Sequence, residues 1–356
     1  MIHFDSNGLI ESLELGGHKF LFNGRGPKIF GLSGNNISAT VDIADFDEYV
    51  VLNLTLTNNT EIEIFPERVG IYLGVDCYMD KFPEWNKKMF PTFLRCEETH
   101  FYGYFMSPDN DILGIACPEA LPSYNILYNK GGHRIDSVEL DIINQEAHLP
   151  RCGRCIKSIK PNSTIERKIY LFSARKLSDF ENDANKYTGA FGARAEKYTV
   201  EFGERVIIYA DDGVHIDIFT PSSKRIDNYS IADEYGVYTV RCTKNKKSRE
   251  LKIYCRREWG FYLKSAAFQA LEIPQKATTH CESWYGLFSG YLAAKHYPDE
   301  ERDRLIEEKF NEIMPYMFDF ENGKPIVSPY RVQNVSILIS LLTDRYESNP
   351  GKYINS

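Results

Sequence analysis

Apolar and polar residues alternate along most of the first half of the chain. The stretches VVLNLTLTN (50–58) and EIEIF (61–65) repeat with a period of two, which places one face of a β-strand in a core and the other in water. Turn residues such as Gly16-Gly17 separate these stretches. Strands are expected at 9–15, 18–23, 49–57, 61–75, 101–106, 112–116, 124–129, 138–143 and 164–172. So many strands without helices between them predict a large antiparallel β-sandwich over residues 1–173.

The pattern changes at residue 174. Leu177, Phe180 and Ala184 are spaced as on one face of a helix, so residues 174–196 are predicted to contain a linker helix. Short strand patterns then predict a small immunoglobulin-like β-sandwich over residues 197–256. Within it, the basic run KNKKSR at 244–249 is expected to be a solvated hairpin turn. The strand patterns lie at 198–202, 206–210, 215–219, 236–243 and 251–255.

Residues 257–356 follow a helical period. Helices are expected at 261–271, 281–296, 300–316 and 331–344. Pro274, Pro298 and Pro329 lie between them as helix breakers. The fold class predicted for the chain is therefore multidomain β + α, with a large β-sandwich, a small β-sandwich and a C-terminal α-helical region.

Composition and charge narrow the classes of partner. Hydrophobic residues make up 43% of the chain and charged residues 26%, which is typical of a globular protein. The net charge of −8 and the lack of a long basic run argue against nucleic acid as a partner. No apolar run approaches membrane-spanning length, so no membrane partner is expected. These patterns do not determine the oligomeric state.

The N-terminal residues MIHFDSNGLIESLELGG lack the basic-then-apolar pattern of a secretion signal. The protein is expected in the cytoplasm, or in the periplasm or outside the cell if a signal has been removed. Among eight cysteines only Cys152 and Cys155 form a CxxC pair, and a zinc site needs a second such pair. No metal and no other cofactor is therefore predicted, although the sequence leaves calcium binding open.

The densest group of functional side chains lies in the segment TTHCESWYGLFSGYLAAKHYP, residues 278–298. His280, Glu282, Trp284 and Tyr285 lie close together at the start of an expected helix. Polar and aromatic groups beside the free N–H groups of a helix N-terminus suit recognition of a sugar or a carboxylate, with Trp284 as a candidate stacking platform. An ordinary helix with a buried Trp284, and with Glu282 in a capping box, accounts for the same residues.

The order of these parts resembles that of multidomain carbohydrate-active enzymes of the gut Bacteroides type. Those enzymes combine a galactose-mutarotase-like β-supersandwich with an (α/α) toroid, as in several polysaccharide lyases and glycoside hydrolases. The resemblance rests on NLTLTN and RVGIYLGVD in the first β region, on TTHCESWYGLFSGYL, and on SPYRVQNVSILISLL. It implies a mutarotase-like supersandwich at 1–173 and the start of a toroid at 257–356. Within this group the chain resembles most the lyase family that removes rhamnose from glucuronate on arabinogalactan.

The helical region is short for such a toroid. A toroid needs about a dozen helices of average length. Only four or five fit after Trp259. The chain is therefore expected to be a fragment, one half of a split product, or a protein with an incomplete helical layer.

The resemblance implies a polysaccharide lyase that cleaves a uronic-acid-containing glycan by β-elimination. A base removes the proton α to the carboxylate, and a cationic or amide group must neutralise that carboxylate. His280 and Tyr285 are the candidate acid and base. Arg331 follows a Ser-Pro turn and suits the carboxylate, with Gln333 and Asn334 beside it. A surface arginine at a helix start accounts equally for Arg331.

A glycoside hydrolase of the same architecture is the alternative. Two carboxylates would flank the bond, with Glu282 as the first and Asp319 or Glu321 as its partner. A non-catalytic glycan-binding protein is a third alternative. In each case the expected partner is a polysaccharide or an oligosaccharide.

Aromatic and polar residues also gather in the first β region. In RCEETHFYGYF (95–105), His100, Tyr102 and Tyr104 alternate, so a strand would place them on one face. Such a face can line a sugar cleft, and Trp85 in the loop PEWNKKMFP (83–91) could cover it. Ordinary strand positions account for each of these residues as well.

Overall fold

The computed structural model describes residues 1–34, 36–77, 86, 88–128, 135–147, 155–272, 296–319, 321–322, 324–325, 343 and 347. The chain divides into two compact units. The first contains Met1–Tyr198, Arg205–Ser230 and Val237–Ile253, and the second contains Thr199–Glu204, Ile231–Gly236 and Tyr254–Ser356. Within the part that the structure describes, no helix has both the length and the apolar composition needed to cross a bilayer.

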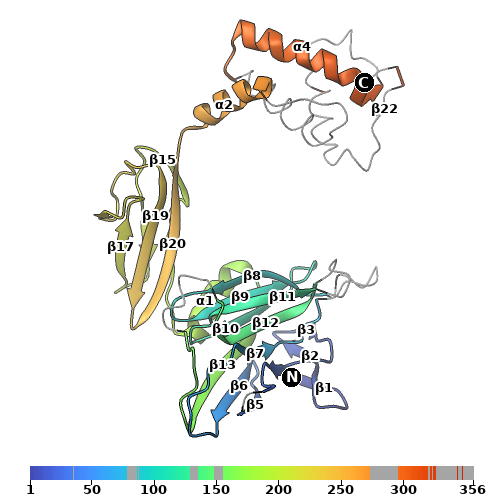
Figure 1. The fold of residues 1–356 in the computed structure, drawn as a ribbon, viewed down its shortest axis with the longest axis vertical. Helices are drawn as coiled ribbons and strands as arrows, with labels where there is room; N and C mark the ends of the chain where they lie inside the picture. Colours follow the sequence, from blue (N-terminus) through green and yellow to red (C-terminus); the bar gives the residue numbers. More distant parts are fainter. Residues whose placement is uncertain are drawn as a thin grey trace. The chain divides into compact units, whose positions relative to one another are not determined.

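The first unit is built on three antiparallel sheets (Figure 1). The largest sheet contains β5 (Ile37–Asp45), β6 (Tyr49–Asn58), β8 (Phe90–Cys96), β9 (Phe101–Met106), β10 (Ile112–Cys117) and β13 (Ser163–Ala174). The other two contain β1 (Ile2–Phe4), β2 (Ile10–Leu15), β3 (His18–Leu21), β4 (Lys28–Phe30), β7 (Arg68–Tyr72), β11 (Ser123–Tyr128) and β12 (Ile135–Asn144). The strand orders are β5-β6-β13-β10-β9-β8, β11-β12-β7-β4 and β1-β2-β3. The prediction of mostly antiparallel sheets is confirmed, and these sheets are consistent with the predicted β-sandwich.

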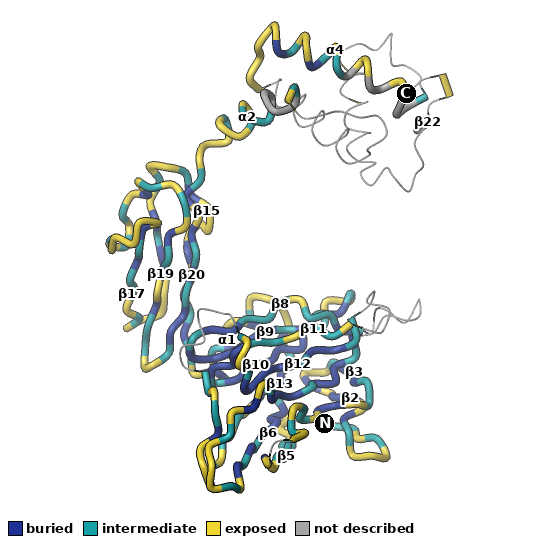
Figure 2. Tube along the Cα trace, in the orientation of Figure 1, coloured by how far each residue is buried: buried dark blue, intermediate teal, exposed yellow. Residues whose placement is uncertain are grey.

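The main hydrophobic core is shared by these sheets. On β6, Leu52, Leu54 and Leu56 are buried, while the residues between them are partly exposed. These leucines belong to the same cluster as Ile71 on β7 and Leu140 on β12. Figure 2 shows the buried positions along the strands. Removing both inner faces from water stabilises the stacked sheets.

The helix α1 (Leu177–Thr188) lies on the outer face of the largest sheet. Phe180 and Ala184 are buried, at the spacing that makes one stripe along a helix. They pack in a second hydrophobic cluster with Tyr102 on β9 and Phe172 on β13. The sheet is therefore apolar on both faces beneath α1.

A five-stranded sheet follows in the chain. It contains β15 (Thr199–Glu201), β17 (His215–Phe219), β18 (Arg225–Ile226), β19 (Gly236–Lys244) and β20 (Lys247–Arg256), in the order β15-β20-β19-β17-β18. The pairing of β15 with β20 is parallel, whereas β17 pairs antiparallel with β18 and β19. Two short strands, β14 (Ala193–Ala195) and β16 (Ile208–Ala210), form a separate antiparallel pair. The immunoglobulin-like assignment stays a prediction.

The turn between β19 and β20 was expected to be solvated, and this is wrong for its last two residues. Asn245 and Lys246 have φ values of 49° and 64°, as a two-residue type I′ hairpin requires. Ser248 and Arg249 are only 6% and 4% exposed, however. The backbone N–H of Ser248 donates a 3.0 Å hydrogen bond to Oγ1 of Thr99, so this end of the hairpin packs against the first β-sandwich within the first unit.

The described helices of the second unit are α2 (Trp259–Glu272) and α4 (Glu300–Met317). They correspond to the helices predicted at 261–271 and 300–316. The short strands β21 (Phe318–Asp319) and β22 (Lys324–Pro325) pair after α4. The helices predicted at 281–296 and 331–344 lie almost entirely outside the described residues. The (α/α) toroid therefore stays a prediction.

Candidate functional site

Strand β9 sends its aromatic side chains to opposite faces of the largest sheet. Phe101 and Phe105 are buried in the main core. Tyr102 and Tyr104 lie on the face that α1 covers. The period of two along a strand requires this separation. Tyr102 and Tyr104 therefore share one face, as their spacing in the sequence predicts.

A pocket of about 360 Å³ opens beside these two tyrosines, within the first unit. We call it the α1–β9 pocket. Its lining is mostly aromatic and aliphatic, and its charged groups are two arginines and one glutamate. The residues are Phe93, Arg95, Tyr102, Tyr104, Leu177, Phe180, Glu181, Ala193, Tyr198, Arg249 and Leu251. Apolar walls with a few fixed polar groups are typical of small-molecule sites of this size.

Arg249 is the most constrained charged group of the α1–β9 pocket, with an exposure of only 4%. Its Nη2 donates hydrogen bonds to the Tyr102 hydroxyl at 2.7 Å and to Oε1 of Glu181 at 2.6 Å. Its Nη1 donates to the Phe191 carbonyl at 3.3 Å. Burial disfavours the charge, but Tyr102 and Glu181 outweigh that effect and raise the pKa of Arg249. The pocket therefore holds a permanent, oriented cation.

Arg95 supplies the second cation. Its Nε lies 2.6 Å from Oε1 of the buried Glu97, and its Nη2 donates to the Glu250 carbonyl. Burial raises the pKa of Tyr102, against the opposing effect of the two arginines. The Tyr102 phenol therefore keeps its proton at neutral pH. The arrangement can bind and neutralise an anion, and its tyrosine is poorly suited to act as a base.

The sequence predicts that His100 shares the face of the tyrosines and lines a sugar cleft. The structure places His100 just before β9, where it is 1% exposed and absent from the lining of the α1–β9 pocket. Its ring stacks on Tyr102 at a centroid distance of 5.6 Å, and its Nδ1 lies 3.1 Å from Oγ1 of Thr99. Burial above all, together with nearby cations such as Lys247, lowers the pKa of His100 to about 3. His100 is thus a neutral packing group behind the pocket.

Most of the site residues predicted from the sequence lie outside the described residues. They are His280, Glu282, Trp284, Tyr285, Arg331, Gln333 and Asn334 in the part of the chain predicted to be helical, and Trp85 in the loop predicted at 83–91. Their catalytic and binding roles stay predictions. Tyr102 and Tyr104 are the predicted binding residues that the structure brings together in one pocket.

Asp319, a candidate hydrolase carboxylate, is engaged in a turn. It accepts hydrogen bonds from the backbone N–H groups of Glu321 and Asn322, at 3.1 and 3.0 Å, and from the Asn322 side chain at 2.7 Å. These bonds, led by the one from the Asn322 side chain, lower the pKa of Asp319. A general acid needs a raised pKa, so this environment disfavours Asp319 in that role.

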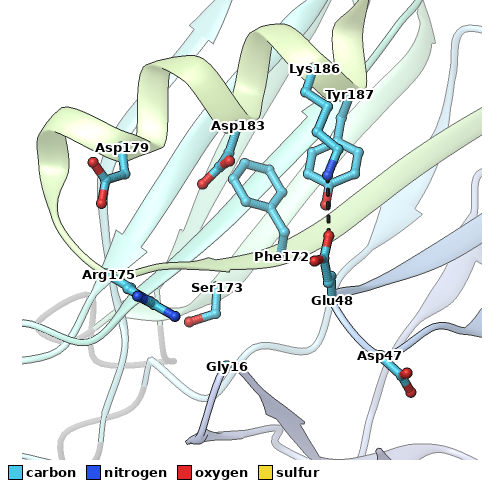
Figure 3. A pocket seen from close by; sticks show the side chains of 10 residues that line it. All are labelled: Gly16, Asp47, Glu48, Phe172, Ser173, Arg175, Asp179, Asp183, Lys186 and Tyr187. Carbon is cyan, nitrogen blue, oxygen red and sulfur yellow. Dashed lines mark hydrogen bonds and ion pairs between the residues drawn. The ribbon is translucent and has the colours of Figure 1, made fainter.

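A second pocket, of about 460 Å³, lies along the other flank of α1 (Figure 3). We call it the β13–α1 pocket. Its lining includes four carboxylates and two cations. The residues are Gly16, Asp47, Glu48, Phe172, Ser173, Arg175, Asp179, Asp183, Lys186 and Tyr187. Lys186 donates a 3.2 Å hydrogen bond to Glu48, and burial raises the pKa of Asp183. Among the residues that the structure describes, no three His, Cys, Asp or Glu side chains gather as metal ligands.

Three charged residues of the α1–β9 pocket were not predicted from the sequence. Arg249 lies in the basic run interpreted as a solvated turn, and nothing in that run indicates its burial. Glu181 follows Leu177 by four residues, so the helical period does place both on one flank of α1. Arg95 is the first residue of the segment that contains Tyr102 and Tyr104, but the sequence alone indicates no partner for its side chain.

Comparison with known proteins shows a polysaccharide-lyase-like fold. No protein-family model and no curated protein matches the sequence. Among solved structures, the chain is similar to the Bacteroides protein named "Polysaccharide Lyase BACCELL_00875", with a TM-score of 0.67 and 13% sequence identity. The match covers 98% of this chain and 56% of that one, so this chain spans about half the length of its structural neighbour.

Proposed function

We propose that this protein is a carbohydrate-active enzyme, a polysaccharide lyase that cleaves a uronic-acid-containing glycan by β-elimination. One observation carries the proposal: the likeness in fold to a polysaccharide lyase extends over 98% of the chain. The proposal includes the finer expectations from the sequence, which are a mutarotase-like supersandwich, an (α/α) toroid and a substrate in which rhamnose is attached to glucuronate. It also includes a periplasmic or extracellular location.

The residues proposed to perform the elimination belong to the part of the chain predicted to be helical. His280 and Tyr285 would move the proton at the carbon next to the carboxylate, and Arg331 would neutralise that carboxylate. Gln333 and Asn334 would add hydrogen bonds at the same group. Trp284 would stack on the sugar ring. Glu282 would cap the helix or take part in catalysis with His280 and Tyr285. If the carboxylate of the substrate is not neutralised, the proton on the neighbouring carbon is too weakly acidic to be removed at a useful rate.

The test is an assay for the unsaturated uronate that elimination produces, which absorbs in the ultraviolet. The protein is incubated with glycans that contain rhamnose attached to glucuronate. We expect the absorbance to rise, and His280→Ala and Tyr285→Phe each to lower the rate about a hundredfold or more, the usual contribution of general acid–base catalysis. His215→Ala and Tyr209→Phe replace exposed residues of the same types and serve as controls.

Two outcomes separate this proposal from its alternatives. Release of reducing ends without any rise in absorbance would indicate a glycoside hydrolase. Binding of the glycan without turnover would favour a non-catalytic glycan-binding protein, a second candidate that is supported by the coverage of only 56% of the neighbouring lyase. Full activity in both the His280 and Tyr285 variants would contradict the assignment of the site.

A further inference from the structure

We infer that the α1–β9 pocket is a binding site for an acidic sugar, whose carboxylate pairs with Arg249 in the position that Glu181 occupies in this structure. The ligand class is a hexuronate, a pyranose ring with one carboxylate. The site goes beyond the proposed function, because it lies within the first unit and contains none of the residues proposed to perform the elimination.

Arg249 is fixed in place before any ligand binds. The Phe191 carbonyl and the Tyr102 hydroxyl each accept a hydrogen bond from its guanidinium. A pre-oriented guanidinium loses little conformational freedom when an anion binds, which favours affinity. Its Nε is buried and has no hydrogen-bond partner in the described part of the chain. The guanidinium therefore retains an unused donor.

The Glu181 carboxylate can leave this ion pair at a small cost, whereas the Arg249 guanidinium cannot be left without a carboxylate partner. The Glu181 side chain is 53% exposed, whereas that of Arg249 is 4% exposed. A half-exposed carboxylate regains its hydration when it turns into water, but a buried guanidinium without a partner does not. Exchange of the Glu181 carboxylate for that of a ligand therefore keeps the buried cation paired at a small cost.

The walls of the pocket favour a sugar acid over a simple carboxylate. Because Glu181 is tethered beside Arg249, a free carboxylate must offer further contacts to displace it. Tyr104 and Phe180 form an aromatic wall with their ring centroids 4.8 Å apart. Leu177 and Tyr198, which also line the pocket, are each 51% exposed. These rings and side chains can cover the apolar face of a pyranose.

The two pockets differ in charge, so they are expected to differ in their affinity for an acidic sugar. The α1–β9 pocket is lined by two arginines and one glutamate, and the buried Glu97 pairs with Arg95, so its charges balance. The β13–α1 pocket has four carboxylates and two cations and is net negative. An anion is repelled by the second pocket but not by the first. Binding of an acidic sugar is therefore expected on one flank of α1 and not on the other.

The experiment measures the binding of D-glucuronate and D-glucose by calorimetric titration of the full chain. Free glucuronate has no sugar linked to it that elimination could release, so binding is measured without turnover. We expect wild type to prefer glucuronate. Glu181→Gln should tighten glucuronate binding by roughly two- to fivefold, the worth of one partly exposed ion pair, and leave glucose unchanged. Glu48→Gln removes the same charge from the β13–α1 pocket and should change neither affinity.

Two further variants locate the site. Tyr198→Ala, at an exposed position, should weaken binding of both sugars. Arg249→Gln should abolish the preference for glucuronate, and the Glu181 and Tyr198 variants keep the test valid if that variant does not fold. The inference would be overturned if wild type bound glucose as tightly as glucuronate, or if Glu181→Gln left glucuronate binding unchanged or weaker. Absence of lyase activity alongside intact glucuronate binding would reject the proposed function alone.

Discussion

Arg249 on β20 donates a 2.7 Å hydrogen bond to the hydroxyl of Tyr102 on β9, across 147 residues of sequence. The same guanidinium carbon lies 5.3 Å from the centre of the Tyr102 ring. A hydrogen bond and a cation–π contact therefore join the hairpin to the largest sheet inside the first unit. Both residues also line the α1–β9 pocket, so the contact that attaches the hairpin to the sheet is part of the candidate site.

This contact predicts a coupled loss of stability. Arg249→Gln should lower the free energy of unfolding by about 1–3 kcal/mol, because the buried Tyr102 hydroxyl loses a partner. Tyr102→Phe should lower it by about 1–2 kcal/mol for the reciprocal reason. The double variant should lose less than the sum of the two. Urea denaturation of the four proteins gives the coupling energy.

The control for this cycle is Arg194→Gln. Arg194 is an exposed arginine of the same unit, stacked over Tyr209 at 4.7 Å. Its replacement is expected to change stability by less than about 0.5 kcal/mol. Strict additivity of the Arg249 and Tyr102 variants would show that the two residues do not act together.

His100 predicts a dependence of stability on pH. In the unfolded chain its pKa is near 6.5, whereas burial lowers it to about 3 in the fold. Between these values the unfolded state binds more protons, so this contribution to stability is complete above pH 6.5 and is lost as the pH falls towards 3. The slope amounts to at most about 1.4 kcal/mol per pH unit.

The measurement compares wild type with His100→Gln by urea denaturation between pH 6.5 and pH 5, above the range in which most carboxylates titrate. Glutamine stays neutral, so the slope of the unfolding free energy against pH should fall in this variant. His215→Gln changes a histidine whose side chain is 62% exposed and should leave the slope unchanged. An identical slope in wild type and His100→Gln would refute the burial argument.

The fold was predictable from the sequence wherever one face of an element is buried. The alternation at 49–57 corresponds to β6, and the helical spacing from Leu177 corresponds to α1, which ends at Gly189 in the left-handed conformation. The single strand predicted at 61–75 is wrong in its first half, since β7 spans only Arg68–Tyr72. Pro66 explains this difference, because proline has no N–H to donate to a neighbouring strand.

The α1–β9 pocket was predictable only in part. The period of two is a local property, and it correctly placed Tyr102 and Tyr104 on one face. The burial of Arg249 depends on a contact with a strand 147 residues away, and no local pattern contains that information. The strand β5, Ile37–Asp45, was missed although Ile37, Ala39 and Val41 alternate with polar residues. The alternation is present in the sequence of β5, but the small and polar residues of this strand make the hydrophobic pattern weak.

Cysteine burial predicts which thiols resist alkylation. Burial raises the pKa of Cys77 and Cys117, and raises that of Cys242 to about 11. Iodoacetamide reacts with the thiolate, so these three should stay unlabelled in the native protein at pH 8 and become labelled in urea. Among the cysteines that the structure describes, Cys155 is partly exposed and should be labelled first. Peptide mass spectrometry assigns each site, and native labelling of Cys117 would contradict its burial in the core.

Phe180 predicts how strongly α1 is attached to the sheet. Its side chain is 3% exposed, and its ring lies 4.8 Å from Tyr104 and 6.1 Å from Phe172. Phe180→Ala should destabilise the first unit by about 3–5 kcal/mol, since it removes buried aromatic surface and leaves a cavity between helix and sheet. Leu177→Ala, on the same helix at a position 51% exposed, should cost less than about 0.5 kcal/mol.

Amide hydrogen exchange adds a local measurement to this comparison. Because α1 forms one wall of both pockets, its release from the sheet would open both. In Phe180→Ala we expect the backbone amides of α1 to exchange faster while those of β6 and β13 stay protected, since the main core on the other face of the sheet is intact. Leu177→Ala should exchange like wild type. Equal protection of α1 in both variants would mean that contacts other than Phe180 attach the helix.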